Sequence, residues 1–245
     1  MPFEGASNFR DLGGYHTASG GRTRWSTVYR ADSLHELTPV DVQRYSELGI
    51  RVVYDLRRDS EREIRPNLVP AIALCITTPI DVAGVEPLDL TVMSDRRSGE
   101  QLLRTMYANM LAHSGAVIGE LFTGLADPAR VPAVFHCHAG KDRTGIVAAL
   151  LLEALGVSRA DVLDDYELTA CYRRRECHLK SYATLLGTGM AAEAAAAVLG
   201  APRWAMADTM DDLDSVYGGV DAYLLGLAGL GPATLDRLRG LLVDT

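Results

Sequence analysis

The stretch between residues 131 and 155 constrains the fold of this chain more than any other part. The apolar run at 131–135 is typical of a buried strand, and the string HCHAGKDRTG follows it at 136–145. Residues 144–155 are apolar almost all round, which is typical of a helix surrounded by protein. A buried strand that leads through a short polar loop into a buried helix needs partners on both sides. Residues 131–155 therefore predict an α/β fold in which this strand, loop and helix lie at the centre.

Further strands and helices alternate before this unit. Strands are predicted at residues 26–30 and 50–56, and helices at 39–48, 101–113 and 115–125. Such alternation predicts a central, mainly parallel sheet flanked by helices. Residues 79–99 show no clear period and predict a long connection.

Beyond the central unit the pattern is almost entirely helical. Helices are predicted from Ser158 past Arg175 toward Leu186, at 191–199, and from Pro202 and Pro232 onward. The helices within about 158–222 exceed what a minimal sheet needs as cover. Some of them are therefore candidates for a lid over a site.

The central loop brings a thiol, a glycine and a guanidinium together. Cys137 is expected where backbone N–H groups converge in front of a helix N-terminus, and both features favour a thiolate. Arg143 can hold two phosphate oxygens with its planar fork. Gly140 allows the tight turn that brings the backbone close to an anion. This combination is typical of a loop that wraps a phosphate dianion and attacks its phosphorus with sulfur.

The remaining side chains of the loop also suit a phosphate. The Thr144 hydroxyl can hydrogen-bond the sulfur, and His136 is expected to orient the loop rather than to take part in the chemistry. The residues expected to bind phosphate are His138, Ala139, Gly140, Lys141, Asp142, Arg143 and Thr144.

Other interpretations of Cys137 remain open. A cysteine at a strand end is often a small buried hydrophobe. His136, Cys137 and His138 would make poor metal ligands, because adjacent residues of an extended backbone point to opposite sides. A redox or sulfur-transfer enzyme would leave Arg143 without a role, and the loop has no CxxC pair. A phosphate-binding module without turnover would be expected to lack one of the reactive groups.

Composition narrows the possible partners and the compartment. A net charge of −8 argues against binding to nucleic acid. Four cysteines in 245 residues are sparse, which favours a reduced, cytoplasmic protein without a structural zinc site. We expect no signal peptide and no transmembrane segment, because no suitable apolar stretch exists. Export by a route that needs no signal peptide stays open.

The loop and three further segments resemble one family. HCHAGKDRTG is similar to the loop of the bacterial cysteine-dependent tyrosine and dual-specificity phosphatases. NFRDLGGY at 8–15, VYDLR at 53–57 with Glu61 nearby, and YGGV at 217–220 resemble the same family. The resemblance implies a protein tyrosine phosphatase-like fold, one phosphatase domain over residues 1–245 and a helical lid. It also implies a two-step reaction through a phosphocysteine, with no metal or other cofactor.

The proton donor for the leaving group stays open among several carboxyl groups. The Trp-Pro-Asp tripeptide of animal-type tyrosine phosphatases is absent. Asp55 ends a predicted strand in the segment where the resemblance places the acid, and Asp142 lies in the loop itself. We favour Asp55 over Asp142 as the proton donor, and Asp81 and Asp95 are further candidates. Alternatively, Asp55 forms a structural ion pair with Arg57.

The substrate class follows from the sequence only in outline. The resemblance implies phosphotyrosine in a phosphorylated protein, with phosphoserine or phosphothreonine, a phospholipid headgroup or a small-molecule phosphate as alternatives. Arg173 to Arg175 with Lys180 form a basic cluster that suits acidic substrates, or that is simply a solvated helix face. The oligomeric state is not predicted.

Overall fold

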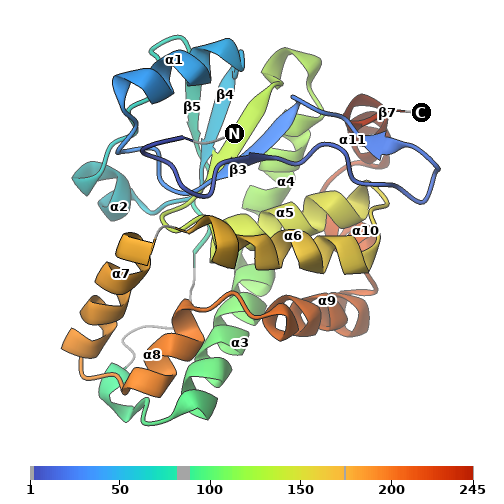
Figure 1. Cartoon of the computed structure of the whole chain (residues 1–245). Coiled ribbons are helices and arrows are strands. Elements are labelled where there is room, and N and C mark those ends of the chain that lie inside the picture. Colours follow the sequence, from blue (N-terminus) through green and yellow to red (C-terminus); the bar gives the residue numbers. More distant parts are fainter. Residues whose placement is uncertain (1–2, 82–88, 174, 245) are drawn as a thin grey trace.

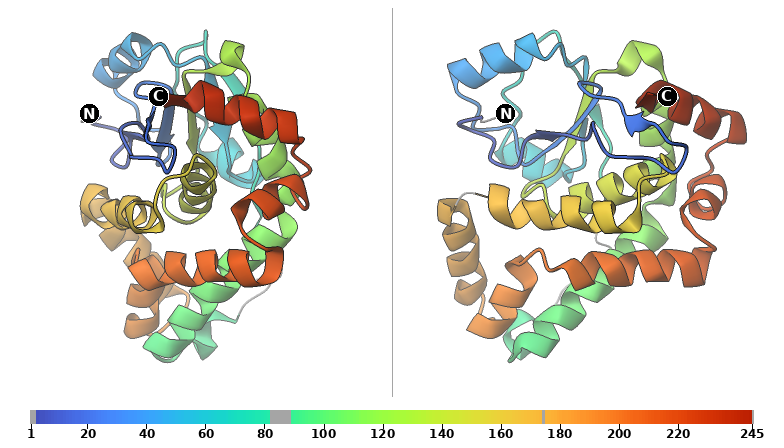
Figure 2. Two further views of the ribbon diagram at one scale, coloured as in Figure 1. Left: turned by 90° about the vertical axis from the view of Figure 1, so that its right-hand side faces the viewer. Right: turned by 45° about the vertical axis from the view of Figure 1, so that its right-hand side comes forward.

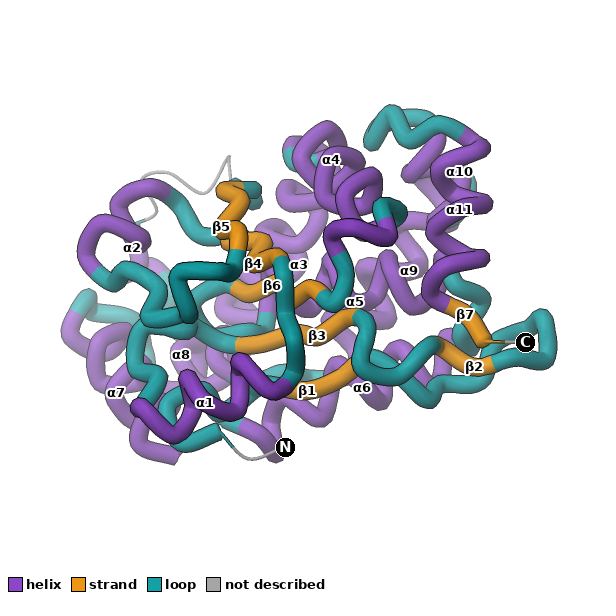
Figure 3. The backbone as a smooth tube through the Cα atoms, turned by 90° about the horizontal axis from the view of Figure 1, so that it is seen from above, coloured by secondary structure: helices purple, strands orange, loops and turns teal. Residues whose placement is uncertain are grey.

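A five-stranded sheet forms the centre of the protein in the computed structural model, which describes residues 3–81, 89–173 and 175–244. The strands lie in the order β1, β3, β6, β4, β5 (Figure 3). Their bounds are Arg10–Asp11, Val28–Ala31, Ala133–His136, Val52–Asp55 and Leu74–Thr77. β3, β6, β4 and β5 are parallel, and only β1 is antiparallel. The predicted mainly parallel sheet flanked by helices is confirmed.

The central strands are buried on both faces, as parallel strands usually are. Every residue of β3, β4 and β6 is buried. Successive side chains of β6 point to opposite faces, so Val134 joins one apolar cluster while Ala133 and Phe135 join another. The sheet therefore lies between two cores.

The smaller core lies on the face covered by the N-terminal segment and α1 (Pro39–Glu47) (Figure 1). Thr38 caps α1 and forms a capping box with Asp41, as the sequence indicates. The short helix α2 (Asp59–Ile64) follows β4.

The larger core lies on the other face and is built around α5. The helices that contribute to it are α3 (Arg96–His113), α4 (Gly115–Leu125), α5 (Asp142–Ala154), α6 (Arg159–Tyr172), α9 (Arg203–Tyr217), α10 (Val220–Leu225) and α11 (Pro232–Leu242). Nearly all of α5 is buried, as predicted for the central helix. β2 (Arg22–Thr23) and β7 (Val243–Asp244) form a separate two-stranded sheet.

The prediction of one helix from Ser158 past Arg175 is wrong in one respect, because the structure has two helices here. α6 ends at Tyr172, and α7 (Arg175–Gly187) begins after a bend. The backbone of Arg173 is extended, and its guanidinium donates to the carbonyl of Leu199. No glycine or proline marks this bend, so a tertiary contact overrides the local helical pattern.

α8 (Ala192–Leu199) lies beside the first half of α3, away from the sheet, and α7 packs against the other side of α8 (Figures 1 and 2). α8 packs on α3 through Leu102, Ala194 and Ala195, whereas α7 contains no buried residue among those described. The predicted connection at 79–99 contains a short 3-10 helix (Leu90–Val92) and the start of α3, and residues 82–88 lie outside the described part. A second 3-10 helix (Pro128–Arg130) precedes β6. None of the described helices is long and apolar enough to cross a membrane.

Candidate functional site

The central loop lies at the carboxyl edge of the sheet, between β6 and α5. β6 ends at His136 and α5 begins at Asp142, so Cys137 follows the strand directly and faces a helix N-terminus. Cys137 as a whole is 2% exposed. In parallel α/β sheets this edge is where ligands usually bind. The sequence-based placement of the cysteine is therefore confirmed.

Gly140 holds the loop in a conformation that another residue would resist. Its φ is +63°, and a Cβ there would lie 2.7 Å from both the Ala31 carbonyl oxygen and the Asp32 nitrogen. Its carbonyl accepts hydrogen bonds of 2.8 Å from Asn8 Nδ2 and from Arg30 Nη2. In a trans peptide the following N–H points the opposite way, so these two bonds also aim the Lys141 amide.

A buried ion-pair network supports that carbonyl from behind. Asp165 accepts from Arg10 Nε at 2.9 Å, from Arg30 Nη1 at 2.5 Å and from the Tyr15 hydroxyl at 3.1 Å. Burial lowers the pKa of Arg30 to about 10, so its guanidinium stays charged at neutral pH. Sequence reasoning missed Arg30 and Asp165. The only signal was the NFRDLGGY segment, which contributes Asn8 and Arg10.

Arg143 is held by a carboxylate and keeps one edge of its guanidinium open. Glu61 accepts from Nη1 at 2.6 Å and from Nη2 at 2.8 Å, and the Leu56 carbonyl accepts from Nη1 at 3.3 Å. Among the described residues, Nε and the second N–H of Nη2 have no partner. These two donors form the fork that suits two phosphate oxygens.

The ion pair between Glu61 and Arg143 shifts the pKa of both side chains. Burial alone would raise the pKa of Glu61, but the hydrogen bonds and charge of Arg143 outweigh it and lower the pKa to about 2. Burial would likewise lower the pKa of Arg143, and the Glu61 carboxylate raises it instead. Glu61 therefore stays ionised and fixes the arginine before any ligand arrives.

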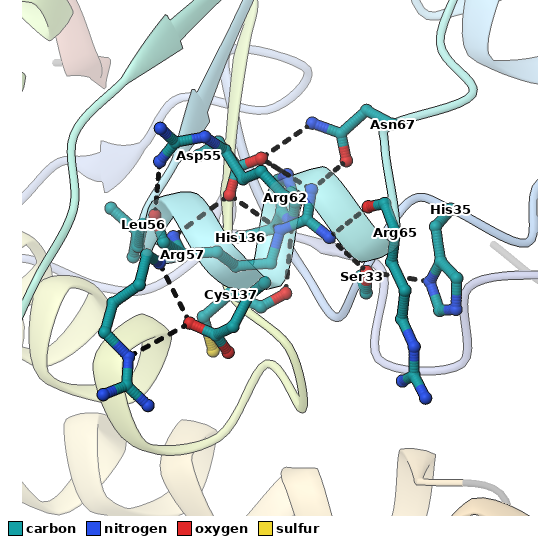
Figure 4. Close-up of polar contacts among 12 residues, drawn as sticks. Ser33, His35, Asp55, Leu56, Arg57, Arg62, Arg65, Asn67, His136 and Cys137 are labelled. Carbon is teal, nitrogen blue, oxygen red and sulfur yellow. Dashed lines mark hydrogen bonds and ion pairs between the residues drawn. The ribbon is translucent and has the colours of Figure 1, made fainter.

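Asp55 lies at the end of β4, as predicted, but its carboxylate is fully engaged. It accepts from Arg57 Nε at 2.9 Å, from Arg57 Nη2 at 2.7 Å and from Asn67 Nδ2 at 2.9 Å (Figure 4). Burial would raise its pKa, but the Arg57 hydrogen bonds outweigh that effect and the pKa lies below its usual value. The geometry matches the alternative of a structural ion pair with Arg57. A carboxylate held in this way is poorly suited to donate a proton.

His136 lies between Asp55 and the reactive loop. Its Nδ1–H donates to the Cys137 carbonyl at 3.0 Å, and its Nε2 lies 3.6 Å from Asp55 Oδ2 (Figure 4). Burial lowers its pKa to about 4, so the ring is neutral at pH 7. This position fits the expected orienting role.

Asp142 lies in the first turn of α5, with one oxygen held and the other without a partner among the described residues. Its Oδ1 accepts from the Tyr107 hydroxyl at 2.7 Å and lies 3.1 Å from Lys141 Nζ. The Tyr107 hydroxyl also contacts that of Tyr166 at 2.7 Å. α3 and α6 therefore both position this carboxyl group, which the sequence alone did not reveal.

Three other loop side chains differ from simple expectation. Lys141 Nζ donates to the carbonyls of Val198 and Gly200 at 2.6 and 2.8 Å, so its ammonium binds the end of α8. His138 Nε2 lies 3.2 Å from Arg65 Nη1 at the exposed rim. The buried Thr144 hydroxyl has no hydrogen-bond partner among the residues that the structure describes, so the expected bond to sulfur is not formed.

The other candidates for acid or metal chemistry lie elsewhere. Asp95 caps α3, and Asp81 is exposed beside the undescribed segment. All four cysteines are free thiols. Within the described ranges there is no group of three or more His, Cys, Asp or Glu side chains that could hold a metal ion.

Comparison with known proteins gives matches over nearly the whole chain. The model of a tyrosine phosphatase family matches residues 1–244. The triple specificity protein phosphatase PtpB of Mycobacterium tuberculosis is 30% identical, with 98% of this chain and 97% of the relative covered. A putative tyrosine-protein phosphatase of Cupriavidus necator is 29% identical, with 91% and 82% covered. The crystal structure of P. aeruginosa TpbA matches with a TM-score of 0.35 and 18% identity, over 83% of this chain and 87% of that one.

Proposed function

Because the chain belongs to the tyrosine phosphatase family and is a hydrolase of that family, we propose that it hydrolyses phosphomonoesters through a phosphocysteine on Cys137. One observation carries the proposal: the thiol follows β6 at a helix N-terminus, and Arg143 presents an open two-donor edge in the same loop. A phosphate dianion needs both features, a positive cradle and a bidentate clamp.

In the first step the Cys137 thiolate attacks phosphorus and the bond to the leaving oxygen breaks. The loop amides and Arg143 stabilise charge on the phosphate oxygens, and the residues from His138 to Thr144 form the cradle. In the second step water attacks the phosphocysteine, inorganic phosphate leaves and the thiolate returns. The unpartnered Thr144 hydroxyl is free to turn toward the departing sulfur.

We assign the proton transfers to Asp142 rather than to Asp55. Asp142 has one oxygen fixed by Tyr107 and Lys141, which leaves the other to give a proton to the leaving oxygen and later to take one from water. Both oxygens of Asp55 already accept hydrogen bonds from Arg57, which favour the ionised form. Asp55 then acts through Arg57 and His136 as a positioning residue.

We propose phosphotyrosine in proteins as the main substrate, with phosphoserine, phosphothreonine and phosphoinositide headgroups as further ones. The relative from M. tuberculosis is named a triple specificity phosphatase. A phosphorylated small metabolite is the alternative, since the loop chemistry requires only an accessible phosphomonoester.

The proposed function also bears on the domain organisation, the compartment and the lid. We propose that residues 1–245 form a single phosphatase domain in the cytoplasm, where its four free thiols stay reduced. α6 and α9 belong to the main core, so within the expected lid region only α7 and α8 are left as candidates for a lid.

The decisive test is turnover of p-nitrophenyl phosphate in the presence of a chelator. We expect hydrolysis by the wild type and none by Cys137→Ser, which should still bind inorganic phosphate. No turnover by the wild type would favour a phosphate-binding module. Loss of turnover on chelation would indicate a metal enzyme.

A further inference from the structure

A basic pocket lies beside the loop and has no part in the proposed chemistry. It has a volume of about 280 Å³. Its lining residues come from the end of α6, the start of α7 and the end of α8 with the two residues that follow it. These three helices are labelled in Figure 1. Its polar lining side chains are Arg173, Arg175 and His178, and the rest of its lining is Ala170, Leu199, Gly200 and Ala201. None of the described residues that line it is acidic.

The pocket shares a wall with the reactive loop. Lys141 of the loop donates to the Gly200 carbonyl at 2.8 Å, and Arg173 donates to the adjacent Leu199 carbonyl at 3.0 Å. Both carbonyls belong to residues that line the pocket. The end of α8 and the residue after it therefore contact both Arg173 of the pocket and Lys141 of the loop.

The pocket carries uncompensated positive charge. Arg173 uses one donor on Leu199, and no hydrogen bond or ion pair engages Arg175 or His178 within the described residues. Burial lowers the pKa of His178, and the charges of Arg173 and Lys141 lower it further. The same cations that lower the pKa of this imidazole would stabilise an anion placed among them.

We propose that this pocket binds a second anionic side chain of a phosphorylated peptide, a carboxylate or a second phosphate, while the first phosphate occupies the loop. The inference rests on the proposed function and specifies its substrate. A peptide is favoured over an anionic bilayer because the protein carries a net charge of −8, which opposes approach to a broad negative surface. A small pocket with two arginines instead suits one anionic group.

The test compares phosphotyrosine peptides that differ only at one flanking residue, which is glutamine, glutamate or phosphoserine at each of several positions. Affinity is measured by calorimetry on a Cys137→Ser background, so that no turnover is needed. Arg175→Gln and His178→Gln remove the unengaged pocket groups. Arg237→Gln, an exposed arginine on α11, is the matched control.

We expect at least one anionic peptide to bind roughly 5- to 10-fold more tightly than its glutamine counterpart, a preference that the control keeps. Arg175→Gln and His178→Gln should bring the ratio close to one while leaving turnover of p-nitrophenyl phosphate unchanged in the active enzyme. The proposal is overturned if no anionic peptide is preferred, or if the preference survives both variants. Binding to vesicles that contain an anionic phospholipid is measured for the same proteins. The proposal is equally overturned if the variants weaken vesicle binding and leave peptide binding unchanged.

These results separate the two claims. Turnover that depends on Cys137, with no change of peptide preference in the pocket variants, would refute the pocket alone. Failure of the wild type to hydrolyse p-nitrophenyl phosphate would refute the proposed function, while the binding ratios would still decide whether the pocket is an anion site.

Discussion

Replacing Asp55 by asparagine should lower the free energy of unfolding strongly. It should not specifically slow proton transfer to the leaving group. The Asp55 side chain is 4% exposed, and its carboxylate accepts two side-chain hydrogen bonds from Arg57 and one from Asn67. Asparagine keeps the shape but removes the charge and turns one acceptor into a donor. Arg57, which is fully buried, would then face an N–H group and lack its counter-ion.

Breaking one side of a buried pair typically costs about 3–5 kcal/mol. For a domain of this size each kcal/mol lowers the melting temperature by about 2–4 °C, so a loss of roughly 6–20 °C is expected. The pKa of Asp55 is lowered in the folded protein, so its contribution is present above the unfolded value of about 3.9 and is lost as pH falls through the folded value. The difference between wild type and variant should therefore shrink below about pH 4.

Urea denaturation measures the stability of both proteins across this pH range. Turnover of the folded fraction is compared for p-nitrophenyl phosphate and for phosphotyrosine, which has the poorer leaving group. We expect similar fractional losses on both substrates. An Asp55→Asn protein as stable as the wild type, with a loss confined to the poor leaving group, would refute the structural assignment and restore Asp55 as the acid.

Three further variants examine the reactive loop. Asp142→Asn should lower kcat/KM, which reports the step that releases the leaving group, by roughly 10²- to 10⁴-fold for phosphotyrosine and much less for p-nitrophenyl phosphate; equal losses of kcat/KM on the two substrates would argue against it as the acid. Arg143→Lys should reduce kcat by roughly 10²- to 10³-fold, because an ammonium cannot replace the fork, and a near-normal kcat would contradict the clamp. Glu61→Gln should be less stable than wild type at neutral pH in urea titrations. That difference should fade below about pH 4, since the stability from a carboxylate with a pKa of about 2 is lost as it becomes protonated, and a pH-independent difference would contradict the ion pair.

The local features of the site could be predicted because they depend on neighbours in sequence. The apolar run before Cys137 forms β6, the apolar helix after it forms the buried α5, and Gly140 adopts the positive φ that its loop requires. Each of these follows from hydrophobic period or from the absence of a Cβ. Asp55 also lies where the strand prediction placed it, at the end of β4.

The parts that could not be predicted depend on contacts between distant segments. Arg30 and Asp165 are 135 residues apart in the chain, and nothing in either local sequence indicates that they form one buried pair. Lys141 was expected to face the phosphate, but the end of α8 supplies carbonyls that hold its ammonium elsewhere. The same helix end draws Arg173 out of the helical path.

The proposed mechanism requires that Cys137 becomes phosphorylated during turnover, and trapping this intermediate would detect that step itself. Asp142→Asn enzyme is mixed with p-nitrophenyl phosphate and a chelator, quenched in acid after a few milliseconds to seconds, digested and analysed by mass spectrometry. We predict one phosphoryl group on the peptide that contains Cys137, which disappears as the substrate is consumed and is absent from Cys137→Ser. Turnover that continues in Cys137→Ser, or a phosphoryl group on another residue, would contradict the account.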